Sequence, residues 1–331
     1  MATYKGIHGY RVESLSSDPP AETSLGQLWY NTTSGVLKYS IEGAGTWAAG
    51  NNMTAVQAQM GFAGIQTACI QFGGSNAAGT PDKDCESYNG TSWTESADIP
   101  TLKYQNAGFG TSTAAISAGG LTPPAVTNET FVWDGTSWTA GNDLVDATRN
   151  IHGCGTQTAG LIAGGQPTSR AQDTATYDGT SWTETNDLQA GRNGIPVVGT
   201  TTAALAIGGN PASGEPSSVA VEIYDGTSWT EGNNILDARI EAGASGTTTS
   251  ALLFGGYGGG HSTTLTANCE TWDGTSWTEG NNMGTARAWI GTGQTSPSTA
   301  SLAFGGDDPA KSRATEEFNS PVYTIKTVTS S

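Results

Sequence analysis

Short apolar runs, each ending in a Gly-Gly pair, alternate with polar segments along most of the chain. One such run, Ala159-Gly-Leu-Ile-Ala163, precedes Gly164-Gly165. Because the run is short and bounded by turn-forming residues, it indicates a β-strand. The surrounding pattern predicts four short strands, over 150–156, 159–163, 173–177 and 181–183. Between the last two, Asp178-Gly179 predicts a hairpin, since glycine tolerates positive φ and aspartate caps the turn.

This four-strand unit is repeated with nearly constant spacing. A segment such as Tyr177-Asp-Gly-Thr-Ser-Trp182 ends each full copy, and the next Gly-Gly pair begins 26 residues after the Trp in five cases and 28 in the sixth. Length varies after the Gly-Gly pair, where 11 to 15 residues precede the aromatic residue that corresponds to Tyr177. A fixed core with one variable loop per repeat, at a period of about 44 to 50 residues, is typical of β-propeller blades.

The recurrent glycines and tryptophans are expected to be structural. The glycine pairs leave room where blades crowd toward an axis, and a Trp is large enough to fill the space between neighbouring blades. The first glycines of the pairs are Gly73, Gly119, Gly164, Gly208, Gly255 and Gly305, and the tryptophans are Trp47, Trp93, Trp138, Trp182, Trp229 and Trp277.

Six Gly-Gly pairs predict six blades, but the last repeat lacks its final Gly-Thr-Ser-Trp. The missing strand is present at the other end of the chain, as Gly45-Thr46-Trp47, so we expect it to pair around Thr315–Phe318 and close the ring. The predicted fold is therefore all-β, a six-bladed β-propeller over 45–319. A leader over 1–44 precedes it, and a tail over 320–331 follows.

Composition and charge exclude several classes of partner. The 331 residues include 30 acidic and 13 basic residues, for a net charge of −17. Such a surface repels phosphate backbones and anionic lipid headgroups, so we expect neither nucleic-acid binding nor membrane insertion. The chain begins without the apolar core of a signal peptide, and no apolar run reaches the length of a membrane span. Among the four cysteines there is no Cys-x-x-Cys pair, and Cys69 and Cys154 are expected to be buried thiols.

The repeat resembles the kelch propeller repeat, through the Gly-Gly after an apolar strand, the later aromatic residue and Trp, and a basic residue ten or eleven positions after the Trp. The basic residues are Lys103, Arg149, Arg192, Arg239 and Arg287, and Gln57 interrupts the series. We expect them to bond loop carbonyls or acidic residues of neighbouring blades. The alternative is a ring of positive charge that binds an anionic sugar. The kelch resemblance implies a fold and not a function.

The leader suggests a biological setting. Residues 26–31 and 36–40, joined by Thr32-Thr33-Ser34-Gly35, predict a β-hairpin. The phrase "GQLWYNTTSG" followed by "LKYS" resembles a leader of tail and virion proteins of tailed bacteriophages, especially marine ones. This resemblance implies a virion protein, assembled in the host cytoplasm, whose leader docks on other virion proteins. A tail fibre or surface adhesin is the expected role. The alternatives are a capsid-surface decoration protein, a cellular kelch interaction module and a secreted carbohydrate-active enzyme.

We expect no enzyme activity, no metal and no cofactor. Some kelch propellers are copper-radical oxidases, whose site needs two histidines and two tyrosines. The three histidines here, His8, His152 and His261, share no spacing. Asp-Gly-Thr-Ser-Trp resembles the sialidase Asp box but has one residue too few between Asp and Gly. No Gly-x-Ser-x-Gly nucleophile elbow occurs.

The variable loops are the candidate binding surface. They span 75–83, 121–128, 166–172, 210–218, 257–267 and 307–313. Alternating strand direction puts all six on one face, together with the connections between blades, and loops on a rigid scaffold commonly carry recognition. Within the longest loop, Tyr257 and His261 are the candidate binding residues. The expected contacts are a host surface glycan or protein, or another copy of the chain in a homo-oligomer.

Overall fold

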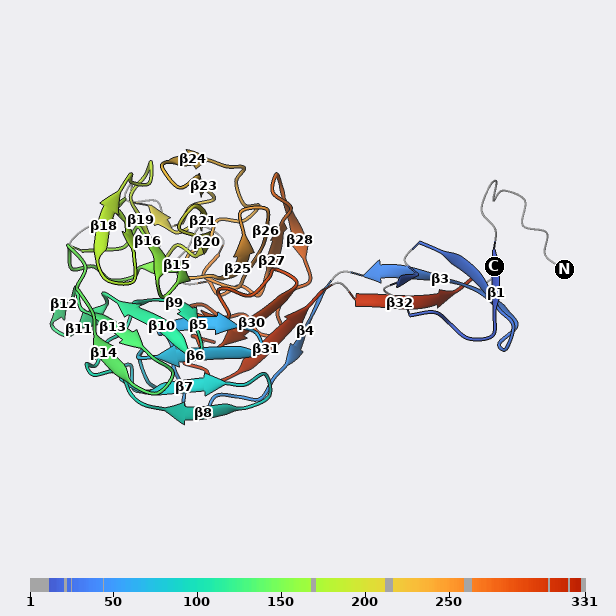
Figure 1. Cartoon of the computed structure of the whole chain (residues 1–331), viewed down its shortest axis with the longest axis horizontal. Helices are drawn as coiled ribbons and strands as arrows, with labels where there is room; N and C mark the ends of the chain where they lie inside the picture. The colour runs from blue at the N-terminus through green and yellow to red at the C-terminus, as the bar shows by residue number, and fades with distance from the viewer. Residues whose placement is uncertain are drawn as a thin grey trace. The chain divides into compact units, whose positions relative to one another are not determined.

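The computed structural model describes residues 12–20, 23–24, 26–43, 45–167, 171–211, 217–258, 264–308, 310–320 and 322–328. These residues form strands, turns and loops without an α-helix. The chain divides into a small unit, residues 1–46 with 319–331, and a large unit, residues 47–318. Figure 1 shows the strands of both units. The all-β fold expected from the apolar runs is confirmed.

The large unit is built from four-stranded antiparallel sheets, numbered I to VI here. Sheet I contains β5 (Gly61–Ile65), β6 (Ala68–Phe72), β7 (Cys85–Tyr88) and β8 (Trp93–Ser96), and sheet II contains β9 (Ala107–Thr111), β10 (Ala114–Ala118), β13 (Thr130–Trp133) and β14 (Trp138–Ala140). Sheet III contains β15 (His152–Thr156), β16 (Ala159–Ala163), β17 (Thr174–Tyr177) and β18 (Trp182–Thr185), which are the four strands predicted for this repeat.

Sheets IV to VI follow the same plan. Sheet IV contains β20 (Val197–Thr200), β21 (Ala203–Ile207), β23 (Val221–Tyr224) and β24 (Trp229–Glu231), and sheet V contains β25 (Gly243–Thr247), β26 (Ser250–Phe254), β27 (Cys269–Trp272) and β28 (Trp277–Gly280). Sheet VI contains β29 (Gly291–Thr292), β30 (Ala300–Phe304), β31 (Thr315–Asn319) and β4 (Thr46–Ala49), so its outer strand comes from the N-terminal part of the chain. Two short pairs, β11 (Leu121–Thr122) with β12 (Ala125–Val126) and β19 (Arg192–Asn193) with β22 (Asn210–Pro211), lie in the connections.

The first strands of successive sheets contact one another. In chain order these contacts join β5 to β9, β9 to β15, β15 to β20, β20 to β25 and β25 to β29, and β29 also contacts β5. Figure 1 accordingly shows the sheets of the large unit grouped around a common centre. This architecture is compatible with a β-propeller.

The hairpin that ends each repeat is held by an aspartate, as its sequence predicts. Tyr177 pairs with Trp182, and the four residues between them form the loop. Asp178 Oδ1 accepts hydrogen bonds from the backbone N–H of Thr180 and of Ser181, both at 2.8 Å, and Gly179 has a φ of 94°. The same pattern recurs at Asp134, Asp225 and Asp273, and at Asn89 in sheet I.

The Gly-Gly pairs bring the backbone of one sheet against the connection to the next. Gly164 and Gly165 both have positive φ, and the Gly165 N–H donates to the Arg192 carbonyl at 2.9 Å. A Cβ on Gly164 would overlap that same carbonyl oxygen. Glycine is therefore required both for the backbone conformation and for the close approach.

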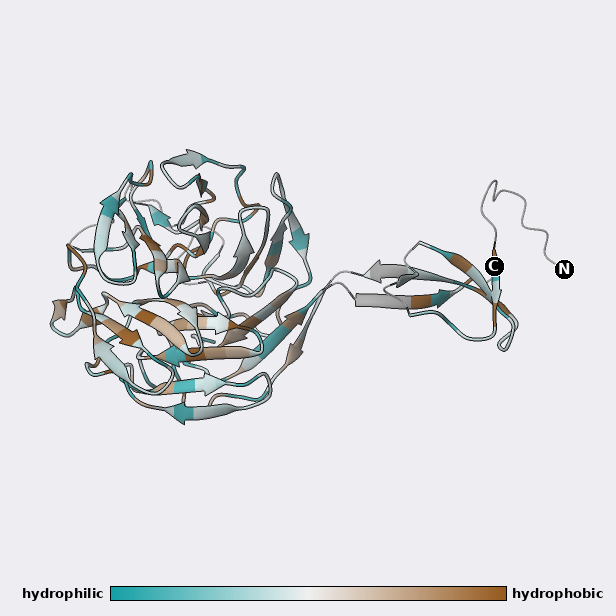
Figure 2. Ribbon diagram, in the orientation of Figure 1, coloured by the Kyte–Doolittle hydropathy of each residue, from teal (hydrophilic) through white to brown (hydrophobic). Residues whose placement is uncertain are grey.

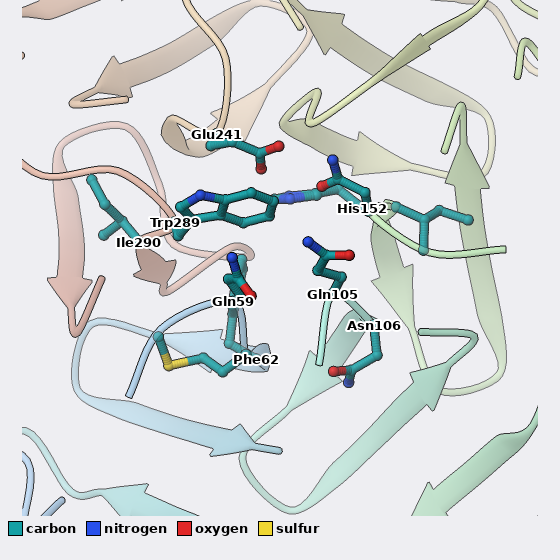
Figure 3. Close-up of a pocket in the computed structure, with 11 residues that line it drawn as sticks. Gln59, Phe62, Gln105, Asn106, His152, Glu241, Trp289 and Ile290 are labelled. Atoms are coloured by element: carbon teal, nitrogen blue, oxygen red, sulfur yellow. The ribbon is translucent and has the colours of Figure 1, made fainter. Parts of the chain in front are cut away.

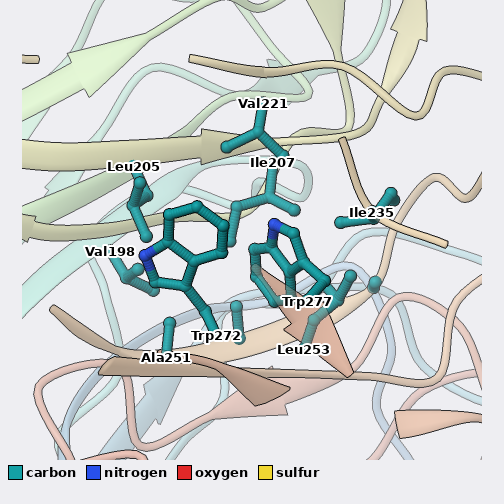
Figure 4. Close-up of a cluster of buried hydrophobic side chains, with 11 residues drawn as sticks. Val198, Leu205, Ile207, Val221, Ile235, Ala251, Leu253, Trp272 and Trp277 are labelled. Atoms are coloured by element: carbon teal, nitrogen blue, oxygen red, sulfur yellow. The ribbon is translucent and has the colours of Figure 1, made fainter. Parts of the chain in front are cut away.

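The core lies between neighbouring sheets. Figure 4 shows Trp272 and Trp277 of sheet V packed against Leu205 and Ile207 of sheet IV, all of them buried. Hydrophilic residues lie instead on outer strands such as β8, β18 and β28 (Figure 2). The stacking of aromatic and branched apolar side chains explains how such short strands bury enough surface.

The small unit is a separate four-stranded sheet, in the order β1 (Glu13–Leu15), β2 (Leu28–Asn31), β3 (Val36–Gly43) and β32 (Val322–Thr327). The hairpin predicted at 26–40 is confirmed, with Leu28 opposite Tyr39. The tail assigned to 320–331 is not merely a tail, because β32 pairs antiparallel with β3. Its Val-Tyr-Thr-Ile-Lys-Thr sequence suits a strand, but nothing local indicates a partner nearly 300 residues away.

Candidate functional site

The variable loops and the connections between sheets are hydrogen-bonded to each other. The residue after each Gly-Gly pair pairs with a residue of the connection that leads into the first strand of its own sheet. Examples are Ser75 with Ala58, Leu121 with Tyr104 and Tyr257 with Ile240. We call the surface made by these loops and connections the loop face.

Tyr257 lies on the loop face with its hydroxyl engaged. Its backbone forms isolated β-bridges with Ile240 and Leu265. Its hydroxyl donates to Asp307 Oδ2 at 3.4 Å, and Asp307 lies in the corresponding loop of sheet VI. Burial, and then the nearby Asp307, raise the pKa of Tyr257 to about 12. His261, the other candidate binding residue of this loop, lies outside the described residues.

The basic residues of sheets IV, V and VI are buried in ion pairs. Arg192 contacts Glu222 at 2.7 Å, Arg239 contacts Glu270, and Arg287 contacts Glu316 at 2.8 Å. Each guanidinium also donates to the carbonyl of the first glycine of its Gly-Gly pair. The expected structural role is therefore confirmed for these three residues, and they do not present their charge to a ligand.

The prediction that Arg149 belongs to the series of basic residues is wrong. The carbonyl that accepts from the Gly-Gly pair of sheet II belongs to Thr148, so Thr148 holds the position occupied elsewhere by Lys103 or Arg192. The acidic partner is also missing in sheet III, where Ala175 aligns with Glu222. A cavity of about 40 Å³ remains there, lined in part by Thr148, Ala175 and Ile162. A one-residue offset after the Trp cannot be detected from the residue type alone.

Lys103 is a different variant of the same arrangement. Its ammonium lies 4.4 Å from the centre of the Phe131 ring and 3.7 Å from Glu129. Burial lowers its pKa to about 8, although Glu129 and Asp143 act in the opposite direction. A lysine over an aromatic ring thus replaces the Arg–Glu pair in sheet II.

The six tryptophans pack between sheets. Trp138 lies edge-on to Phe72 and Trp93 is tilted against Phe304, each with ring centres 4.8 Å apart and with the phenylalanine in an adjacent sheet. Several indole N–H groups also donate across the boundary, such as Trp182 to Thr130 Oγ1 and Trp229 to Thr174 Oγ1, both at 3.0 Å. Trp47 is the partly buried member, and its N–H contacts Cys269 Sγ at 3.2 Å.

A further set of residues, which the sequence analysis did not identify, meets where the first strands converge. Each lies twelve positions after a recurrent Trp and has a φ between 54° and 61°. Five hydrogen bonds join them in order, each N–H donating to the carbonyl of the preceding member, at 2.7 to 3.2 Å. We call Gln59, Gln105, Asn150, Gly194, Glu241 and Trp289 the central set. Non-glycine residues with such φ values are strained and occur often at functional sites.

The side chains of the five non-glycine members of the central set line a small cavity, the central pocket (Figure 3). The cavity measures about 20 Å³, and His152, Asn106 and Phe62 also contribute to its wall. In Figure 3, Glu241, Gln59 and Gln105 point toward its middle from different sides, beside the indole of Trp289. A space of this size holds about one water-sized group.

Burial controls the charge state of the pocket. It raises the pKa of Glu241 to about 8, which a hydrogen bond from Asn150 only partly offsets. It also lowers the pKa of His152 to about 4, so this imidazole is neutral at pH 7. Gly194 makes room for the acid, because a Cβ at this position would overlap Glu241 Oε1.

Several acceptor atoms in this wall have no donor. Within the described part of the chain, Glu241 Oε2, Asn150 Oδ1, Gln105 Oε1 and Asn106 Oδ1 are buried and have no hydrogen-bond partner. Buried polar atoms are normally paired, so their concentration here indicates a site that takes up a hydrogen-bond donor. The positions of the central set could have been found by aligning the repeats on their Trp residues. Their residue types, however, differ too much to indicate that these positions meet in the structure.

The described residues offer little else for chemistry. They contain no cluster of three or more His, Cys, Asp or Glu side chains arranged to hold a metal ion. All four cysteines are free and buried, as expected for Cys69 and Cys154, and burial raises the pKa of each thiol. Neutral, buried thiols are poor nucleophiles.

Comparison with known proteins adds no assignment: no protein-family model matches the chain, and no curated protein matches it significantly. A lipid bilayer could not be crossed by any helix in the described ranges, since none there has the length and apolarity required.

Proposed function

We propose that the large unit is a six-bladed kelch-like β-propeller, in which β4 completes the last blade, and that the chain is a non-enzymatic virion protein of a tailed bacteriophage. In this proposal sheets I to VI are the blades. Support for the closed ring comes from contacts between sheets VI and I that match those between other neighbours. They include β29 against β5, the Gly306 N–H to the Gln57 carbonyl at 2.9 Å, and the Trp93 N–H to Thr315 Oγ1 at 3.0 Å.

The recognition role is carried by the loop face. Loops of different length are tied to the same repeated framework on one side, whereas the hairpins of the other side share one form, Asp-Gly-Thr-Ser or, in sheet I, Asn-Gly-Thr-Ser. A rigid scaffold with one variable face is suited to receptor or subunit contact. The propeller is therefore a tail-fibre or surface adhesin domain that contacts a host glycan or protein.

The small unit is proposed as the attachment module. Its β-sheet contains both the leader and β32, and Asp18 ties its strands together by accepting from Trp29 and Asn31 and pairing with Lys38 at 2.6 Å. Tyr30 of β2 is 41% exposed and offers an aromatic surface for contact. The phage-like leader phrase lies within this sheet, which supports contact with other virion proteins.

Location in the particle is tested first. Particles released from cells that carry this gene are purified on a density gradient and analysed by mass spectrometry. Peptides of this chain should co-purify with the capsid and tail proteins in constant ratio. Their absence from intact particles would contradict the virion assignment.

Recognition is tested by replacing residues 257–267, which include Tyr257 and His261, with Gly-Ser sequence of equal length. Adsorption of the altered particles to host cells should fall at least tenfold. The matched control carries Thr136→Ala and Thr275→Ala, which change exposed hairpin residues of the opposite face. Unchanged adsorption of the loop variant would assign attachment to another surface or protein.

A further inference from the structure

The central pocket combines one buried carboxylate with several acceptors and no opposing charge. Glu241 is 3% exposed and Asn150 is 7% exposed, and both contribute an unpartnered oxygen to the pocket. Gln105 contributes a third through Oε1. These oxygens lie on three different connections, so no single local turn explains why they converge.

The titratable groups that face Glu241 do not neutralise it. His152 stands across the pocket and is neutral at pH 7, and Tyr257, which lies near enough to interact with Glu241, is an un-ionised phenol. The basic residues closest in sequence, Arg239 and Arg287, are occupied by Glu270 and Glu316. With a pKa of about 8, Glu241 is mostly protonated at pH 7. A ligand that carries a positive charge would favour its ionised form, and would then meet a single carboxylate without a competing cation.

The donor set favours an ammonium group over a metal ion. Ca²⁺ requires six to eight oxygen ligands, usually with several carboxylates, whereas this pocket contains one carboxylate. An ammonium group has three N–H donors, and Glu241, Asn150 and Gln105 each offer one unpartnered oxygen, with Asn106 Oδ1 as a fourth in the same wall. Its size is close to that of water, which suits a cavity of about 20 Å³. The indole of Trp289 adds an aromatic surface that attracts cations.

We propose that the central pocket binds a primary ammonium group, with Glu241 as its counter-ion, Asn150 and Gln105 as further acceptors and Trp289 beside it. The group enters from the loop face, and an amino sugar and a lysine side chain are the two sources that present it. This binding site follows from the pocket alone and stands whether or not the chain belongs to a virion.

The test uses the whole chain and methylammonium chloride as the probe, with sodium chloride of equal ionic strength as the reference. At pH 7.5 methylammonium should raise the melting temperature of the wild type in a saturable manner, with release of the Glu241 proton. Its apparent affinity should increase toward pH 9, because Glu241, with a pKa of about 8, ionises over this range. Glu241→Gln should weaken the apparent affinity at least tenfold. The control Glu184→Gln, which removes one exposed carboxylate of β18, should bind like the wild type.

Further probes distinguish an amino sugar from a lysine side chain as the source of the ammonium group, and test whether the pocket binds a metal ion instead. Glucosamine and Nα-acetyl-lysine amide carry the ammonium group, whereas N-acetylglucosamine lacks it and should not bind. If Glu241→Gln alters folding, saturation-transfer NMR between methylammonium and the wild-type indole protons provides a second measurement. Three results would overturn the proposal: no effect of methylammonium on the wild type, equal binding by Glu241→Gln, or stabilisation by CaCl₂ at a lower concentration than by methylammonium.

Discussion

The position ten residues after each recurrent Trp determines how a sheet fills the space beside its third strand. Sheets IV, V and VI place an arginine there and a glutamate opposite, whereas sheet III has Thr148 and Ala175. The same fold therefore tolerates both a buried ion pair and its complete absence. Loss of one partner alone is different, because it leaves a buried charge without compensation.

This difference predicts the outcome of a substitution series in sheet IV. Arg192→Thr should lower the free energy of unfolding by about 3–5 kcal/mol, because Glu222 is left buried and unpaired. The double variant Arg192→Thr/Glu222→Ala recreates the arrangement of sheet III and should recover a substantial part of that loss. Urea denaturation of both variants measures the effect. A double variant no more stable than Arg192→Thr would show that the pair is not the unit that matters.

Glu241 predicts a dependence of stability on pH. Its pKa in the folded chain is about 8, above the ordinary value of 4.5, so the folded state holds this proton more tightly than the unfolded state. The stabilisation is complete below about pH 4.5 and is lost as the pH rises through 8. Glu241→Gln should remove this component, so its stability relative to the wild type should increase from pH 5 to pH 9. A constant difference over that range would contradict the assignment.

Residues whose type is the same in every repeat could be predicted from the sequence, whereas residues that share only their position could not. The glycines, the tryptophans and the turn aspartates share one physical role each, and their identity reveals it. The six members of the central set share one backbone conformation but belong to five residue types, from Gly194 to Trp289, so their identity could not reveal the pocket. Thr148 was missed for a related reason, since Arg149 beside it has the expected charge.

At the scale of elements, β32 shows how distant parts of the chain combine. Val322–Thr327 pairs with β3 along six residues, from Lys38 opposite Thr327 to Gly43 opposite Val322. The β-branched residues indicate that this segment is a strand. They do not indicate its partner, because β3 lies at the other end of the sequence and no turn connects the two strands. The four-strand repeats were predictable because each strand pairs with a neighbour in sequence.

Removal of β32 should affect the small unit selectively. A chain that ends at Ser320 exposes the edge of β3, so the transition of the small unit should disappear from the calorimetric trace. The main transition should change little, because β31 is retained. A chain that ends at Val328 keeps β32 and serves as the control. If the shorter chain lost the main transition instead, the division into two units would be wrong.

At the scale of the whole molecule, the proposed ring depends on a strand from the N-terminal part of the chain. β4 is the outer strand of sheet VI, and the Gly50 N–H that follows it donates to the Thr315 carbonyl at 2.8 Å. The ring would hold the loop face and the central pocket in register, since sheets I, II, III, V and VI contribute residues to both. The sequence indicated this through the unequal counts of Gly-Gly pairs and Trp hairpins. The convergence of Glu241, Asn150 and Gln105 emerges only when the sheets are assembled.

Hydrogen–deuterium exchange of the β4 amides tests the closed ring most directly. If β4 completes the sixth blade, the peptide covering Thr46–Ala49 should exchange as slowly as the equivalent outer strands β8, β18 and β28. The measurement is made on the intact chain under native conditions, with the peptide covering β1 as a reference from the small unit. Rapid exchange of Thr46–Ala49, while β8, β18 and β28 stay protected, would contradict closure by the N-terminal strand.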